Sequence, residues 1–413
     1  VLPVTDEKAR YPNAYFGDAI CLWLAAELHD GIDIELREAM PRILAYYRDM
    51  EWGWGEHLSD LYVKVIQNEL ATLLLCAKTL PADDRATAES LLGELMNIDA
   101  QYAGGPRVPT IRSYAADHSP TTPEKPSAIY APFAEVVTKK SHPWIAGHLA
   151  ARQGLLVRFM PAARKNRRVQ VSCHDGARAA AWIDKRWRIG VMSRYQLMPD
   201  IDFPEWGLAW QSMPLAFWHA QGDWGYLQWA AEEGGIVRTL PTRRQPNMVS
   251  RVLSDTNHAA AIGYTYGIQR AREFLALRRL PVLAKSWPWV ADRFRVVDAT
   301  GTVKTDMVDG WRRMTVRYAR EVLTVACLPF ADAQAITLRK GAAREWLFEA
   351  RAELEAARPG RLAFLWYLTV DTVPAKPPDL MPESDGNGFS LKLRNGPPLK
   401  LDPWADLPWG TAL

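Results

Sequence analysis

The sequence predicts an α+β protein of two domains, a helical domain followed by a large antiparallel β-sandwich. Apolar residues recur at helical spacing through the first hundred residues, a proline-rich stretch follows, and a period of two dominates afterwards. The chain has 413 residues, more than a typical domain of about 100–200. We therefore expect a helical domain at 1–103, a crossing segment at 104–143 and the sandwich at 144–413.

Four helices are expected in the first domain, near residues 14–29, 34–50, 56–80 and from 83 onward. In the first, Phe16, Ile20 and Trp23 share one face, and Gly31 ends the pattern. Pro81 follows the third helix. The short connections favour antiparallel neighbours in a helical layer.

The crossing segment and the strands differ clearly in pattern. Six prolines make a helix implausible between residues 104 and 132. Strand-like runs follow at 168–172, 186–191, 207–229, 260–268, 315–318, 362–370 and 389–393. One segment of the second half, 343–357, looks helical. Many short strands with few helices between them predict a sandwich of antiparallel sheets.

Composition excludes several classes of protein. Apolar residues make up 48% and charged residues 23%, which is typical of soluble globular proteins. No run approaches the roughly 20 apolar residues of a membrane span, and the first four residues do not look like a targeting peptide. The motifs GxGxxG, GxxxxGK[ST], HExxH and GxSxG are absent, so no nucleotide cofactor or other cofactor is predicted. The basic residues are dispersed and form no nucleic-acid recognition motif, so nucleic acid is not an expected partner.

The net charge of +3 conceals an uneven distribution. Residues 1–150 carry a balance of −8, residues 151–350 one of +12, and the tail one of −1. Most cations of the middle part are arginines, which suit bidentate recognition of carboxylates. They indicate either solvated strand faces or an anionic ligand. The 18 tryptophans either pack in the core or offer flat surfaces for sugar rings.

The first cluster that could carry chemistry is Glu51-Trp52-Gly53-Trp54-Gly55-Glu56-His57-Leu58-Ser59-Asp60-Leu61-Tyr62. His57, Asp60 and Tyr62 come at the expected start of a helix, where backbone N–H groups favour an anion. The alternative is that His57 caps the helix and that the tryptophans fill the core.

The second cluster is Arg112-Ser113-Tyr114-Ala115-Ala116-Asp117-His118 in the crossing segment. A tyrosine beside an arginine can have its pKa lowered and can then act as an acid or base. The alternative is that Tyr114 anchors a loop by its ring. His142, His174, His219 and His258 are candidates to complete a site from the strand-rich half.

The order of these features resembles the polysaccharide lyases of the heparinase II/III and alginate lyase type. The helices with Trp-Gly-Trp-Gly-Glu-His, the crossing with Tyr114 and the segment Asp184-Lys185-Arg186-Trp187-Arg188-Ile189-Gly190-Val191-Met192-Ser193-Arg194 carry the resemblance. It implies an α/α toroid followed by the sandwich. Four helices are too few for a full toroid, so we expect a partial one, and whether an N-terminal part is missing stays open. The resemblance also implies a periplasmic or secreted location.

The resemblance further implies the site and the reaction. In that family an Asn or His neutralises the uronate carboxylate, a Tyr exchanges protons with the sugar, and a His or Tyr of the sandwich assists. His57 matches the first position and Tyr114 the second, while the third stays open among His219, His258 and His142. The expected function is β-elimination in a uronate-containing anionic polysaccharide. Metal content and oligomeric state are left open.

The predicted substrate-binding residues are Trp52, Trp54, Glu56, Tyr62, Arg112, Arg194, Trp206 and Trp210. Arg112 and Arg194 are the expected carboxylate partners, and the tryptophans are the expected stacking surfaces. Two other functions remain open. A glycoside hydrolase would need opposed carboxylates, such as Glu56 or Asp60 with Glu205 or Asp223. A glycan-binding protein would need no catalytic group.

Overall fold

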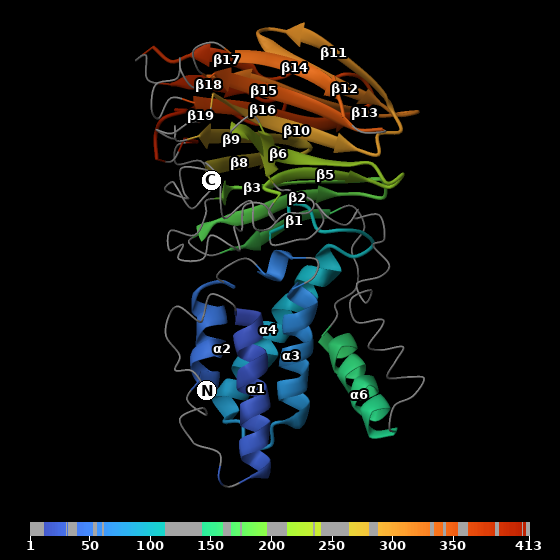
Figure 1. Cartoon of the computed structure of the whole chain (residues 1–413), viewed down its shortest axis with the longest axis vertical. Helices are drawn as coiled ribbons and strands as arrows, with labels where there is room; N and C mark the ends of the chain where they lie inside the picture. Colours follow the sequence, from blue (N-terminus) through green and yellow to red (C-terminus); the bar gives the residue numbers. More distant parts are fainter. Residues whose placement is uncertain are drawn as a thin grey trace.

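The structure of the chain is a computed structural model. It describes residues 12–29, 31, 39–52, 56–59, 62–111, 143–159, 167–173, 176–195, 213–233, 236–240, 264–280, 288–330, 334–341, 344–353, 362–384, 388–406 and 408–409. A helical layer lies against one part of a large β-sandwich (Figure 1). The predicted order of a helical part and an antiparallel sandwich is confirmed.

Five α-helices and one short 3-10 helix are described. They are α1 (Pro12–Leu28), α2 (Ala39–Asp49), η2 (Glu56–Leu58), α3 (Tyr62–Cys76), α4 (Ala82–Gln101) and α6 (Pro143–Phe159). Apolar side chains at helical spacing form their shared core, for example Ile66, Leu70 and Leu73 of α3. These helices form a layer, and a toroid is not confirmed. None of the described helices is long and apolar enough to cross a membrane.

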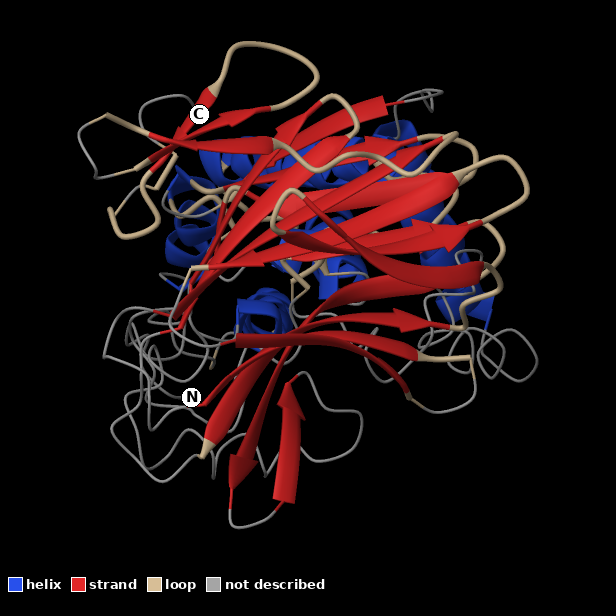
Figure 2. Ribbon diagram, turned by 90° about the horizontal axis from the view of Figure 1, so that it is seen from above, coloured by secondary structure: helices blue, strands red, loops and turns tan. Residues whose placement is uncertain are grey.

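Two large sheets and one small sheet form the second part, and all their strand pairs are antiparallel (Figure 2). The nine-stranded sheet runs β1 (Arg167–Ser172), β2 (Arg178–Ile183), β3 (Trp187–Met192), β5 (Leu215–His219), β6 (Trp224–Glu233), β10 (Trp289–Val297), β15 (Trp346–Glu353) and β14 (Gln334–Lys340), with β7 (Ile236–Leu240) paired to β6. The seven-stranded sheet runs β11 (Thr302–Val308), β12 (Trp311–Arg317), β13 (Val322–Pro329), β16 (Leu362–Asp371), β9 (Glu273–Leu280), β8 (Tyr264–Arg270) and β4 (Arg194–Tyr195). The small sheet runs β17 (Asp379–Pro382), β18 (Phe389–Lys392) and β19 (Leu399–Leu401).

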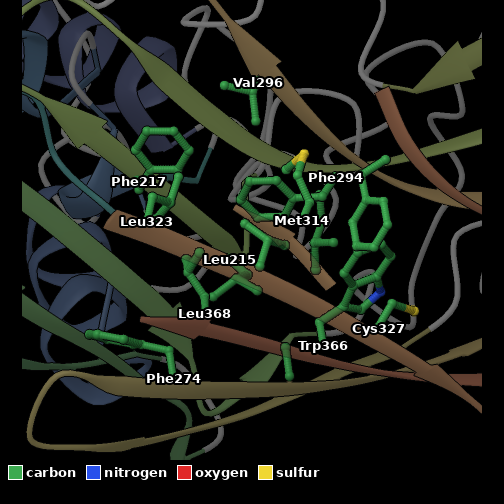
Figure 3. Close-up of a cluster of buried hydrophobic side chains, with 14 of the residues drawn as sticks. Leu215, Phe217, Phe274, Phe294, Val296, Met314, Leu323, Cys327, Trp366 and Leu368 are labelled. Carbon is green, nitrogen blue, oxygen red and sulfur yellow. The ribbon is translucent and has the colours of Figure 1, made fainter. Parts of the chain in front are cut away.

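The main core fills the space between the two large sheets. Its inward side chains include Phe217, Phe294, Met314 and Trp366, all at most 1% exposed (Figure 3). Side chains alternate along each strand, so every second residue faces this core. The opposite face of the seven-stranded sheet is covered by the small sheet through a second apolar cluster that contains Leu391.

Two segments differ from their expected structure. Helix α6 occupies 143–159, so the range expected for the sandwich begins with a helix, which packs on the helical core through Leu155, Leu156 and Phe159. The segment 343–357 was expected to be helical, but β15 is a strand there. Its residues Phe348, Ala350 and Ala352 alternate inward, and pairing with β10 and β14 overrides its helical propensity.

The helical layer joins the sandwich over the outer face of β1–β3. Leu58 and Ile98 pack there against Val169 and Val171 of β1. Arg188 of β3 adds a polar clamp: its guanidinium donates to the carbonyl oxygens of Tyr102 at 2.7 Å, Ala103 at 2.8 Å and Pro106 at 3.0 Å. These carbonyls belong to the segment that directly follows α4, which ends at Gln101, so Arg188 fixes the path of the chain as it leaves the helix.

Candidate functional site

The turn at residues 56–59 holds His57 between the helical layer and the sandwich. The ring of His57 stacks on Trp52 at 5.9 Å, and its Nε2 lies 2.9 Å from the carbonyl oxygen of Ser172. Ser59 then accepts a hydrogen bond from the backbone N–H of Tyr62 at 3.0 Å, which caps the start of α3. The helix cap is therefore Ser59 rather than His57.

His57 is fully buried and electrically neutral. Burial lowers its pKa to about 3, with a smaller lowering contribution from the nearby Arg107 and an opposing one from the hydrogen bond to Ser172. Its Nε2 faces a carbonyl oxygen, so that nitrogen carries the proton and donates it. Nδ1 has no hydrogen-bond partner among the described residues. The expectation that His57 neutralises a uronate carboxylate does not fit this geometry, because the ring has neither positive charge nor contact with solvent.

Trp52 is buried as well. Its side chain is 1% exposed and packs between Tyr47 and His57, with the ring of Tyr47 5.2 Å away. A ring enclosed in this way offers no face to a sugar. Trp52 therefore fills the core, which was the alternative to sugar stacking in the sequence analysis. Tyr62, on the first turn of α3, is partly buried.

Arg194 lies at the edge of the sandwich, just after the end of β3. It is the first residue of β4 and pairs with Tyr266 of β8. The same end of the sheet carries Ser172, whose carbonyl binds His57. Just before Arg194, Ser193 accepts a hydrogen bond from the backbone N–H of Arg178 at 2.8 Å and donates its own N–H to the Arg178 carbonyl at 2.7 Å. These bonds hold the end of β3 against the start of β2.

A groove of about 700 Å³ opens beside Ser193, between the two large sheets. One wall comes from β1 and β2, and the other comes from the β8–β9 hairpin and the loop after β18. We call it the edge groove. Three arginines line it, Arg168, Arg178 and Arg270, together with Gln170, Gln269, Ser193 and Asn395. None of the described residues that line it is acidic, so it favours an anionic, hydrogen-bonding ligand.

Strand alternation produces this groove. Val169 and Val171 of β1 face the helical layer, so Arg168 and Gln170 face the opposite side, and Arg178 pairs with Ser172 on that side. Gly396 has a φ of 88°, and a Cβ there would come within 2.8 Å of the Arg270 guanidinium. A glycine at this turn therefore leaves room for Arg270, which donates to the Pro397 carbonyl.

His219 lies far from the edge groove. It pairs with Trp187 at the start of β3, whereas Arg194 follows the end of that strand. Seven residues of extended chain span about 23 Å. The structure therefore places His219 and Arg194 at opposite ends of the sandwich.

The surroundings of His219 are aromatic and closed. Its ring lies 4.3 Å from Trp187 and 4.4 Å from Tyr318, and burial lowers its pKa. Tyr318 donates to the buried carboxylate of Asp223 at 2.6 Å, and Thr300 donates to it as well. Asp223 is thus occupied within the protein and is not exposed as a hydrolase carboxylate would be.

Several predicted site residues lie outside the described residues. They are Trp54, Asp60, Arg112, Tyr114, His142, His174, Glu205, Trp206, Trp210 and His258, and for Glu56 only the backbone is described. Among the described residues, no three His, Cys, Asp or Glu side chains come together as metal ligands.

Sequence reasoning missed the arginines of the edge groove. The alternation in Arg168-Val169-Gln170-Val171-Ser172 predicted a strand and marked its outward residues, but their position beside Arg270 depends on strand pairing across two sheets. The +12 balance of the middle segment was the one signal that pointed toward them.

Comparison with known proteins gives a loose, architecture-level resemblance. No protein-family model matches the chain, and no curated protein matches its sequence. A heparinase III with methylated lysines aligns with a TM-score of 0.46 at 10% identity, covering 93% of this chain. The heparan sulfate lyase HepC from Pedobacter heparinus aligns with a TM-score of 0.41 at 10% identity, covering 98% of this chain and 67% of its own. The chain spans 64% of the length of that heparinase III.

Proposed function

We propose that the protein is a polysaccharide lyase that cleaves a uronate-containing polysaccharide by β-elimination. The observation that carries the proposal is the edge groove, because Arg168, Arg178 and Arg270 converge there without an acidic side chain among its described lining. A chain of carboxylated sugars matches such a lining in charge and in hydrogen bonding. The proposal gives carboxylate recognition to these arginines instead of His57.

The reaction needs three tasks. A uronate carboxylate is neutralised so that the C5 proton becomes acidic, a base removes that proton, and an acid protonates the leaving oxygen. Arginines suit the first task because they stay charged. Tyr114, with Arg112 beside it in the sequence, remains the predicted proton-transferring residue. Arg112 and Arg194 remain predicted carboxylate partners.

His57 has a positioning role in this proposal. Its bond to the Ser172 carbonyl ties the 56–59 turn to β1, whose other face carries Arg168 and Gln170. The helical layer and the groove wall are thus joined through one strand.

The test is ultraviolet absorbance on a panel of uronate polymers that includes alginate, polygalacturonate and heparan sulfate, since elimination creates an absorbing unsaturated end. Tyr114→Phe should lower the rate by about 10²–10⁴-fold, which is typical of general acid–base help. Arg168→Gln and Arg178→Gln should each weaken polymer binding about 10–100-fold, because a hydrogen bond to a charged group is lost. Arg317→Gln, an exposed arginine on β12, is the matched control and should change neither.

Two results would overturn the proposal. One is a wild-type protein that produces no absorbance with any polymer of the panel. The other is full lyase activity in both the Tyr114→Phe protein and the double Arg168→Gln, Arg178→Gln protein.

A second function is anionic-glycan binding without cleavage. It is favoured by the described lining of the edge groove, which consists of arginines, amides, a serine and small or apolar residues, with no group that exchanges protons near neutral pH. Salt-sensitive binding of a uronate polymer without any unsaturated product would select it.

A further inference from the structure

A second hollow, of about 800 Å³, lies on the outer face of β10, β15 and β14. Arg293 lines it, while its neighbour Phe294 points into the main core. The strand register continues one outward face from β3 through β5 and β6 to β10, so this is the same sheet face on which the helical layer sits, but over different strands. The hollow belongs neither to the edge groove nor to the surroundings of His219.

Two buried charged side chains form its floor. Arg293 is 2% exposed and Glu349 is 4% exposed. Arg293 donates from Nε to Glu349 Oε2, and Arg339 donates to the same oxygen at 2.9 Å. Among the described residues, no hydrogen bond occupies the other carboxylate oxygen of Glu349 or the terminal nitrogens of Arg293, and both side chains line the hollow. Donors and an acceptor therefore remain available at the base of a cavity.

The wall of the hollow is oriented by contacts among its own side chains. The Arg351 guanidinium stacks 4.2 Å above the Trp289 ring and donates from Nε to Glu353 at 2.8 Å. The indole N–H of Trp289 is itself fixed by Glu232 at 2.6 Å. These contacts orient the guanidinium, which reduces the side-chain entropy that its remaining N–H groups lose on binding.

We propose that this hollow binds a neutral, hydroxyl-rich saccharide unit. Its lining balances three arginines against three glutamates. An anion would therefore be repelled by the glutamates here, whereas the described lining of the edge groove has no acidic residue. Neighbouring sugar hydroxyls both donate and accept hydrogen bonds, and Arg293 and Glu349 offer the complementary groups side by side. The volume falls in the range of about 300–1,000 Å³ that is usual for small-molecule sites.

The site goes beyond the proposed lyase function. In the order of the nine-stranded sheet, four strand spacings separate β2 from β10, which is about 19 Å. A saccharide held in the hollow is therefore remote from the groove and takes no part in the elimination.

The experiment screens the full-length chain on an array of neutral oligosaccharides and then titrates the best ligand calorimetrically. Arg351→Ala and Arg339→Ala, both at partly exposed side chains, should each weaken binding about 10–100-fold, because a charged donor is lost. Affinity should stay constant from low to high salt, since the ligand carries no charge. Arg317→Ala is the matched control, and the double Arg168→Gln, Arg178→Gln protein should bind the neutral ligand normally.

Failure here is separable from failure of the lyase proposal, because the measurement is direct binding and needs no turnover. The inference is overturned if the array shows no neutral ligand at millimolar affinity or better. It is equally overturned if the neutral ligand binds both hollow variants as tightly as the wild type, or if binding is lost in the groove variant instead.

Discussion

His57 is a polar side chain whose burial depends on one backbone carbonyl. The bond from Nε2 to Ser172 and the stack on Trp52 keep the ring in place, and burial keeps it neutral. The free energy of unfolding then depends on pH in a defined direction. The unfolded chain takes up a proton below about 6.5, whereas the folded protein does so only near pH 3.

Stability should therefore fall as pH is lowered from 6.5 toward 3, by about 1.4 kcal/mol per pH unit from this group. His57→Gln retains an N–H donor but does not titrate, so its stability should approach that of the wild type as pH falls. Denaturant unfolding at several pH values measures this. His29→Gln, at the exposed end of α1, is the control, and a difference between wild type and His57→Gln that stays constant with pH would contradict the assignment.

The sequence around His57 correctly indicated an unusual turn before a helix. It did not reveal that the side chains of Trp52 and His57 are buried. Two tryptophans, two glycines and a histidine before a helix indicated either a ligand site or core packing. Trp52 and His57 turn out to be packed against each other, and no local pattern distinguishes a stacked pair that faces a sugar from one that faces a sheet.

The segment that follows helix α4 is held by a side chain from a distant strand. Arg188 is 2% exposed and supplies donors to three carbonyls, a task usually met by solvent or a capping residue. Arg188→Met should lower the free energy of unfolding by about 3 kcal/mol or more, because buried carbonyls are left unpaired. Arg188→Lys should recover part of that loss.

Arg186→Met is the matched control for this measurement. Its side chain is 51% exposed and pairs with Glu321, so the expected change is below about 1 kcal/mol. Equal losses in the denaturant midpoint of Arg186→Met and Arg188→Met would rule out the clamp.

Period-two strands were the elements most readily predicted. The runs around β1, β3, β12 and β16 alternate or are apolar throughout, and each is a strand. Helix α6 and strand β15 were not foreseen, because their apolar residues acquire a face only from the neighbours against which they pack. The edge groove is assembled from strands of both sheets, so a local sequence pattern could not predict it either.

The helical layer and the sandwich should unfold together. Leu58, Ile98 and Tyr102 share an apolar cluster with β1 and β2, and a continuous interface of this kind couples two parts. Val171→Asp places a carboxylate in that cluster, so the helical signal in far-ultraviolet circular dichroism should be lost at lower denaturant than the tryptophan fluorescence change. In the wild type the two curves should coincide.

Gln170→Asp is the control for the Val171→Asp unfolding measurement, since it puts the same carboxylate on the exposed face of the same strand. Its two unfolding curves should coincide. If Val171→Asp also gives coincident curves, the two parts do not depend on this cluster for their coupling.

The centre of the seven-stranded sheet is supplied by one of the last strands to be synthesised. β16 lies between β13 and β9, and residues 362–370 are buried. On the ribosome, β9 and β13 emerge with open edges and must wait for β16, about 90 residues after β9. Such edges invite pairing with other nascent chains. Efficient production of this protein should therefore depend on chaperones that shield early strands, and any fragment that stops before residue 362 should aggregate.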